Sequence, residues 1–142
     1  MNRVSFAYIA ALFFSAAAAH AQETDASKRV TLELNAIQTF ENSCQLTFLI
    51  TNGHAQSIDQ AVYETVLFDS AGQVSVITLF DFGTLPPALP RVRQFGIPQV
   101  TCEGLGRVLI NGASTCAGAG LPEAACTKDF TVSTRTAIEV IG

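Results

Sequence analysis

Residues 61–82, AVYETVLFDSAGQVSVITLFDF, carry the strongest structural signal in the chain. The two arms, residues 61–69 and 74–82, are rich in β-branched and aromatic residues, which favour strands. Between them, Asp-Ser-Ala-Gly at residues 69–72 is typical of a turn. The segment therefore predicts a β-hairpin. Because both arms are apolar on both faces, we expect central strands, covered on both sides or meeting a partner on one.

Upstream of the hairpin, two segments alternate between apolar and polar residues. In residues 30–36 and in residues 44–51, every second side chain is apolar. A period of two predicts a strand with one buried face. The second run ends at Asn52-Gly53, a pair typical of turns. Two further strands are thus expected before the hairpin.

Downstream of the hairpin, prolines interrupt the chain and the strands become shorter. Pro90 and Pro98 confine one strand to residues 91–97 and make it an edge strand, because proline cannot donate a ladder hydrogen bond. Residues 107–110 form a short apolar run, and residues 130–140 alternate almost to the end of the chain. Together these segments predict a single all-β domain over residues 29–142, an immunoglobulin-like antiparallel β-sandwich of about seven strands.

The first residues of the chain have the pattern of a cleaved signal peptide. Arg3 is followed by an apolar run to Ala19, and Ala19-His20-Ala21 places small residues at the cleavage-recognition positions. We expect export by the general secretory pathway, removal of residues 1–21, and a polar leader over residues 22–28. The expected location is periplasmic or extracellular. No later segment reaches the about 20 apolar residues that a membrane-spanning helix needs, so no membrane insertion is expected after cleavage.

The charge of the chain excludes one class of partner. The net charge is −4 for the whole sequence, and removal of Arg3 with the signal peptide makes it −5. No run of lysine or arginine is present. Nucleic acid is therefore a poor partner.

The four cysteines, Cys44, Cys102, Cys116 and Cys126, all follow the signal peptide. An even number in an exported chain indicates disulfides, and the absence of closely spaced pairs argues against a metal site. In an up-and-down order of seven strands, the second and sixth begin at the same end. Cys44 opens the second strand on its core face and Cys102 precedes the sixth, so we predict Cys44–Cys102 and Cys116–Cys126.

Two weak resemblances accompany this pattern. Asn52 and the run Phe68-Asp69-Ser70-Ala71-Gly72-Gln73-Val74 resemble short immunoglobulin-like modules, and the whole chain is similar to small uncharacterised exported proteins of Gram-negative bacteria. That resemblance implies a periplasmic location and no known activity. Asp81-Phe82-Gly83-Thr84 followed by Cys102 resembles pilin-like subunits of the spore-coat-U type, although the interval from Cys44 is too long and no aromatic residue ends the chain.

Catalytic signals are weak. His54 is the only histidine after the signal peptide, and its place behind Asn52-Gly53 indicates a solvated turn residue rather than a catalytic base. No G-x-S-x-G motif is present. We expect no catalytic residues, no cofactor and no metal.

Two features mark a partner-binding surface. Arg91 and Arg93 share one face of the predicted fifth strand, and Arg107 joins them if the fifth and sixth strands are neighbours. Such a group would bind an acidic or carboxylate-bearing envelope protein or ligand; the alternative is protection of an edge strand. The second feature is a long loop over residues 111–128, held by Cys116 and Cys126, which serves either binding or resistance to proteolysis.

These observations favour an exported, non-enzymatic binding or accessory module of the periplasm. The first alternative is a pilin-like structural subunit of a surface fibre, whose isolated subunit lacks a strand. The second is a small periplasmic hydrolase that uses His54.

Overall fold

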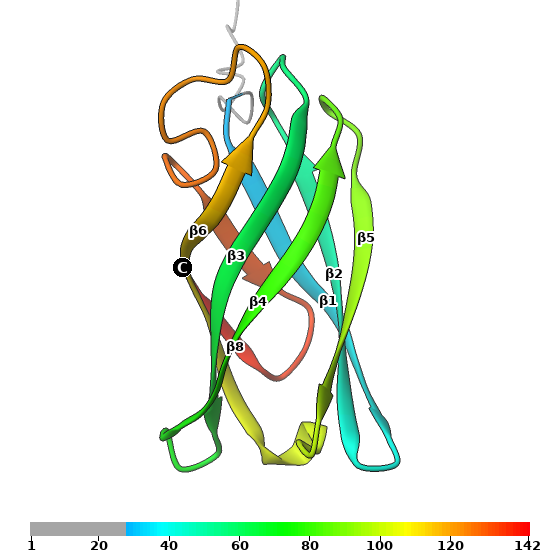
Figure 1. Ribbon diagram of the computed structural model, residues 1–142. Coiled ribbons are helices and arrows are strands. Elements are labelled where there is room, and N and C mark those ends of the chain that lie inside the picture. The colour runs from blue at the N-terminus through cyan, green and yellow to red at the C-terminus, as the bar shows by residue number, and fades with distance from the viewer. Residues whose placement is uncertain (1–27) are drawn as a thin grey trace, which may run out of the picture.

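The computed structural model describes residues 28–142 as a sandwich of two four-stranded sheets (Figure 1). The predicted signal peptide and most of the predicted leader lie outside these residues. The first sheet has the order β5-β2-β1-β7 and consists of β1 (Val30–Phe40), β2 (Ser43–Asn52), β5 (Arg91–Pro98) and β7 (Thr131–Thr134). The second has the order β4-β3-β6-β8 and consists of β3 (Ile58–Asp69), β4 (Val74–Leu85), β6 (Leu105–Ala117) and β8 (Glu139–Ile141). A short 3-10 helix, Cys102–Gly104, leads into β6.

The predicted all-β, immunoglobulin-like sandwich is confirmed, and alternation explains its core. On β1 and β2 every second side chain is buried between the sheets, whereas the intervening residues face outward. Phe48 of β2 stands with its ring centroid 5.8 Å from those of Phe80 and Phe82 on β4, and 6.1 Å from that of Phe95 on β5. Aromatic contacts between strands of opposite sheets thus join the two layers. In the part of the chain that the structure describes, no helix is long and apolar enough to span a membrane.

The predicted hairpin is formed by β3 and β4, but only β3 is a central strand. It pairs with β4 on one side and β6 on the other, whereas β4 is the edge of its sheet. The outward-facing side chains of Ile77 and Leu79 on β4 are 64% and 56% exposed. The expectation that both arms are central is therefore wrong for β4. The apolar residues on its outer face are exposed to solvent, so apolar residues on both faces of a strand do not by themselves indicate a central strand.

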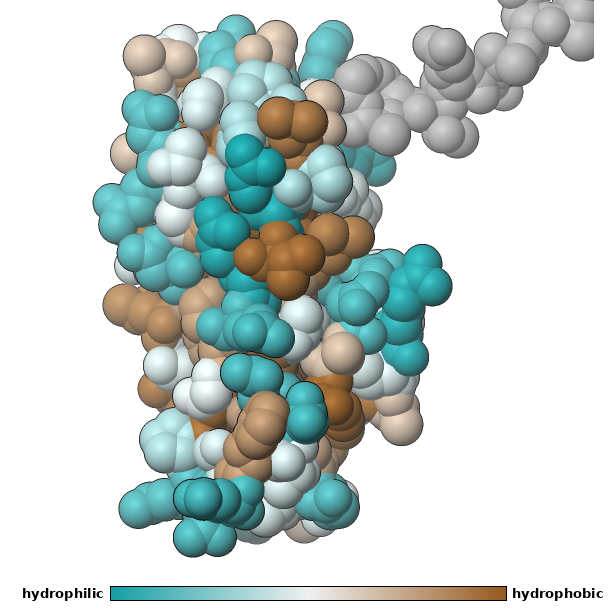
Figure 2. All heavy atoms as spheres, turned by 90° about the vertical axis from the view of Figure 1, so that its right-hand side faces the viewer, coloured by the Kyte–Doolittle hydropathy of each residue, from teal (hydrophilic) through white to brown (hydrophobic). Residues whose placement is uncertain are grey.

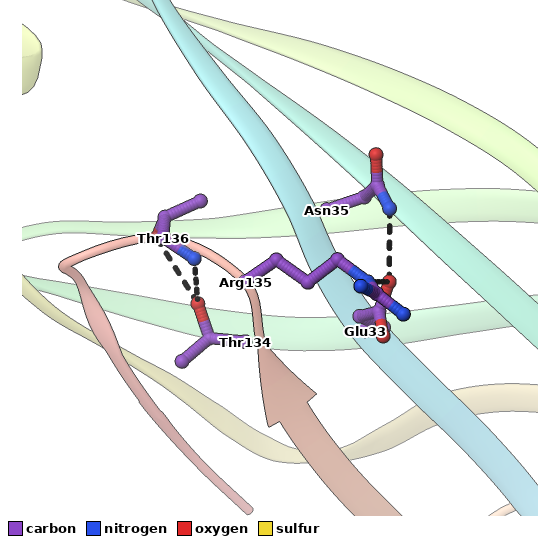
Figure 3. A network of polar contacts seen from close by, with 5 residues as sticks. All are labelled: Glu33, Asn35, Thr134, Arg135 and Thr136. Carbon is purple, nitrogen blue, oxygen red and sulfur yellow. Dashed lines mark hydrogen bonds and ion pairs between the residues drawn. The ribbon is translucent and has the colours of Figure 1, made fainter.

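The C-terminal segment forms two strands rather than the predicted one. β7 pairs in parallel with β1, and β8 pairs in parallel with β6 of the other sheet, so the sandwich has eight strands and two short parallel pairs. Between them, the Thr134 hydroxyl accepts a hydrogen bond from the Thr136 amide (Figure 3). The Thr136 hydroxyl accepts one from the Ile138 amide. Such local hydrogen bonds compete with the strand ladder. The chain therefore turns here and changes sheets.

An ion pair secures this turn against β1. Arg135 Nε lies 2.8 Å from Glu33 Oε1, and Asn35 Nδ2 donates to the same oxygen (Figure 3). The hydrogen bond from Asn35, together with that from Arg135, holds the pKa of Glu33 below its usual range. The Arg135 amide also donates to the Leu34 carbonyl. The crossing segment is thus attached to the first sheet before it reaches the second.

The two disulfides have the pairing predicted from the order of the strands. Cys44 at the start of β2 is bonded to Cys102, which lies just before β6, and the bond links the two sheets. Both of these cysteines are buried. Cys116 on β6 is bonded to Cys126 in the following loop; Cys126 is buried, but Cys116 is exposed. The first bridge belongs to the core and the second to one end of the sandwich.

Candidate functional site

The predicted group of three arginines does not form. Arg91 and Arg93 do share one face of β5, but Arg107 stands on β6 in the other sheet. There it pairs with Glu139 of β8. After β5 the chain crosses from one sheet to the other, so the fifth and sixth strands are not neighbours. The condition on which Arg107 would join the group is therefore not met.

Arg93 closes the open side of the sandwich, where β4 and β5 are the edges of the two sheets. Figure 2 shows this side, on which apolar surface lies among polar residues. Arg93 Nε donates to the Phe82 carbonyl at 2.8 Å, and Nη2 lies 3.5 Å from the Thr84 carbonyl. One side chain thus joins β5 to β4 and occupies backbone acceptors on the edge of β4. These contacts support edge protection for Arg93.

We expect Arg93→Gln to lower the free energy of unfolding by about 1–2 kcal/mol, because backbone carbonyls of β4 lose a charged donor. Urea denaturation followed by circular dichroism measures the change. Arg91→Gln is the matched control, since among the described residues the side chain of Arg91 donates only to the adjacent Pro90 carbonyl. It should change stability by less than about 0.5 kcal/mol. Equal effects of the two substitutions would contradict a closing role for Arg93.

The predicted loop over residues 111–128 begins later than expected. β6 continues to Ala117, and its pairing with β3 passes a bulge in which Asn111 and Gly112 stand opposite Glu64. Gly112 has a φ of +119°, which glycine adopts without strain. The bulge lets the strand continue through small residues that carry little strand signal. The disulfide-held loop therefore covers residues 118–130.

This loop forms one wall of a cleft of about 570 Å³ at the end of the sandwich where β1 begins. Figure 1 shows the loop, in orange, at the upper end. The opposite wall is the β2–β3 connection, from which His54, Ala55 and Gln56 contribute. Charged side chains line the cleft as well: Lys28, Arg29, Glu123, Lys128 and Asp129. Glu123 and Lys128 belong to the loop 111–128 that the sequence marks as a candidate, whereas Lys28, Arg29 and Asp129 lie outside it. Residues from both ends of the domain meet only in the folded state.

Asn52 fixes the wall that the β2–β3 connection forms. It is fully buried, and its Oδ1 accepts a hydrogen bond from the His54 amide at 2.9 Å. Its Nδ2 donates to the carbonyls of Gln56 and Leu85, at 2.8 and 2.9 Å. The bonds to the His54 amide and the Leu85 carbonyl are buried, so each is costly to break. The Asn-Gly turn predicted from the sequence is thus a rigid element that presents His54.

Three contacts hold the loop 118–130 in place, from the β2–β3 connection, β3 and β6. His54 Nε2 lies 2.7 Å from the Ala125 carbonyl oxygen, the Tyr63 hydroxyl donates to the Cys126 carbonyl at 2.8 Å, and the Cys116–Cys126 disulfide closes the loop. The Tyr63 ring is buried and stacks on Phe130, with ring centroids 5.1 Å apart. Burial raises the pKa of the Tyr63 phenol, which therefore stays protonated and donates. The cleft is preorganised by core groups.

His54 differs from the solvated turn residue expected from the sequence, since it is only 6% exposed. A carbonyl oxygen only accepts, so Nε2 must carry the proton that it shares with Ala125. Every fully buried side-chain nitrogen or oxygen of the described residues has a hydrogen-bond partner. No described residue is hydrogen-bonded to Nδ1, so this atom is not fully buried, and His54 is one of the residues that line the cleft. The expectation of a solvated residue is wrong because the loop 118–130 covers the ring.

The chemistry of the cleft suits binding. Within residues 28–142, no carboxylate or hydroxyl group is hydrogen-bonded to His54, and no cluster of three or more metal-ligating side chains is present. The charged side chains of Lys28, Lys128, Glu123 and Asp129 form no ion pair with any described residue. The site thus combines a fixed imidazole with four charges of both signs that have no ion-pair partner among the described residues.

Comparison with known proteins supports the fold alone. No protein-family model matches the chain, and no curated protein matches it. Among solved structures, IrmA from Escherichia coli has a TM-score of 0.57 and 17% sequence identity, over 73% of this chain and 90% of that one. The two disulfides suggest an oxidising, extracytoplasmic location. The protein is a disulfide-bonded β-sandwich that resembles IrmA in fold.

Proposed function

We propose that the protein is an exported, non-enzymatic binding module of the periplasm or extracellular space, and that its site is the end cleft. The observation that carries this proposal is a preorganised hollow lined by four charged side chains, Lys28, Lys128, Glu123 and Asp129, that form no ion pair with another described residue. Clefts of a few hundred Å³ with a few fixed polar groups are typical ligand sites. The loop is already held by His54, Tyr63 and a disulfide, so binding of a ligand costs little conformational entropy of the loop.

The ligand should carry a carboxylate. The sequence indicated an acidic or carboxylate-bearing partner for the arginines, but Arg93 and Arg107 are engaged within the sandwich. Lys28 and Lys128 instead offer ammonium groups at the cleft that form no ion pair with a described residue. The partner class is therefore retained, and its site moves from β5 to the end of the sandwich.

The two alternatives receive less support. A fibre subunit that awaits a donated strand would lack one of its own, whereas here β7 and β8 extend both sheets. A hydrolase of the triad type would need a nucleophile and an orienting carboxylate beside its histidine, whereas no carboxylate or hydroxyl group of the described residues is hydrogen-bonded to His54. For these reasons we propose neither a fibre subunit nor a hydrolase.

The proposal is tested by adding a panel of amino acids, short peptides, uronic acids and dicarboxylates to the ¹⁵N-labelled protein. At least one ligand should shift amide signals of residues 53–56 and 120–129. Ala55→Trp should weaken its binding about tenfold or more, because an exposed residue of the wall then fills the cleft. Ala137→Trp, at an exposed turn outside the lining, is the matched control. Shifts confined to other surfaces, or no shifts with the whole panel, would refute the cleft as the site.

A further inference from the structure

The end cleft is lined by side chains of both charge signs that do not form ion pairs with one another. Lys28 and Lys128 contribute ammonium groups, while Glu123 and Asp129 contribute carboxylates. The ion pairs of the described residues, Arg107–Glu139 and Arg135–Glu33, lie elsewhere. Charged groups that line one hollow without pairing remain available to a ligand that carries complementary charges. A ligand with a single negative charge would use only half of this lining.

The buried imidazole of His54 further limits which groups a ligand of the cleft can carry. The contact with the Ala125 carbonyl places a proton on Nε2, and in the tautomer that carries its proton there, Nδ1 is a hydrogen-bond acceptor. A lone pair needs a donor, so a carboxylate alone would face an acceptor at this point. An ammonium group satisfies Nδ1 and is attracted by the carboxylates of Glu123 and Asp129. His54 thus favours a ligand with a positively charged donor as well as an anionic group.

The remaining lining limits the size of the ligand. Ala55, Gly120, Pro122 and Ala125 supply small apolar surfaces between the charged groups. With a volume of about 570 Å³, the cleft has room for a short chain with methyl-sized side chains and is too small for a folded partner.

From these features we infer that the ligand is a short peptide with free termini and small side chains. Its ammonium group lies at His54, Glu123 and Asp129, and its carboxylate lies at Lys28 and Lys128. This assignment rests on the proposed binding function and specifies its substrate class.

The test compares three probes: trialanine, N-acetyl-trialanine and trialanine amide. They differ only in their end groups, and isothermal titration calorimetry at fixed ionic strength ranks them. Trialanine should bind tightest, and blocking either end should weaken binding about fivefold to tenfold, because each block removes one charge-assisted contact. Binding of N-acetyl-trialanine equal to that of trialanine would show an anion site only and would overturn the inference.

Variants assign each end of the peptide to its own side chains. Glu123→Gln with Asp129→Asn should abolish the preference for a free amino terminus and keep the preference for a free carboxylate. Lys28→Gln with Lys128→Gln should do the reverse. Glu41→Gln, an exposed carboxylate in the β1–β2 turn at the opposite end of the sandwich, is the control and should leave all three affinities unchanged. Loss of both preferences in either double variant would contradict the assignment of the ends.

Failure of this inference is distinguishable from failure of the proposed function. If no trialanine probe binds but a uronic acid or dicarboxylate shifts the signals of residues 53–56 and 120–129, the zwitterionic ligand is wrong and the binding site stands. If no ligand shifts those signals, both are wrong.

Discussion

Replacing Cys44 and Cys102 together with alanine should lower the free energy of unfolding by about 4 kcal/mol. The bridge joins positions 58 apart in sequence, so its loss releases a long loop in the unfolded chain. Both cysteines are also buried, and their removal leaves a small cavity between β2 and the turn before β6. Guanidinium denaturation of the oxidised protein and of the variant measures the difference.

The matched control is the other bridge. Cys116→Ala with Cys126→Ala opens a loop between positions only 10 apart, and Cys116 is exposed. The expected loss is therefore smaller, about 3 kcal/mol at most. A loss from the outer pair equal to or greater than that from the inner pair would contradict the role of Cys44–Cys102 as the bond between the sheets.

Phe48→Ala should lower the free energy of unfolding by about 3–5 kcal/mol, the range for a large aromatic side chain removed from a close-packed core. Phe48 is fully buried on β2, and its ring contacts those of Phe80, Phe82 and Phe95. Two of these residues belong to the opposite sheet, so the substitution removes contacts between the layers. Thermal unfolding followed by calorimetry, together with urea denaturation, gives the size of the effect.

Leu79→Ala is the control for Phe48→Ala. Leu79 is an apolar residue of β4 whose side chain is 56% exposed on the outer face of its sheet. Truncation there removes little buried surface, and the expected change is about 0.5 kcal/mol or less. If Leu79→Ala destabilised the isolated domain as much as Phe48→Ala, the outer face of β4 would have to be covered in solution.

Most strands and their buried faces could be predicted from local patterns. Alternation in residues 30–36 and 44–51 placed Leu32 and Phe48 in the core, where the structure finds them. The turn residues Asp69–Gly72 located the hairpin, and the Asp69 carboxylate accepts hydrogen bonds from the amides of Ala71 and Gln73. These features could be predicted because a strand's period of two and a turn's backbone requirements act between residues close in sequence.

Part of the candidate site could also be predicted. The loop held by Cys116 and Cys126 was recognised as a candidate from its length and its cysteines, although its first residues belong to β6. The sequence does not reveal that His54 is buried, because its proximity to Ala125 depends on a contact between positions 71 apart. Lys128 falls within the predicted loop, but Lys28 belongs to no motif and its place at the cleft depends on the fold.

Long-range pairing settled the rest. The alternating residues 130–140 contain nothing to show that β7 joins the first sheet and β8 the second, and the pattern of β4 does not distinguish an edge strand from a central one. Likewise, the spacing of Arg91, Arg93 and Arg107 does not reveal that β5 and β6 lie in different sheets. A local pattern determines whether a segment is a strand and which of its faces is apolar. Which strands become neighbours depends on the free energy of packing the whole chain. The partner of Arg93 and the residues that meet at the end cleft depend on it in the same way.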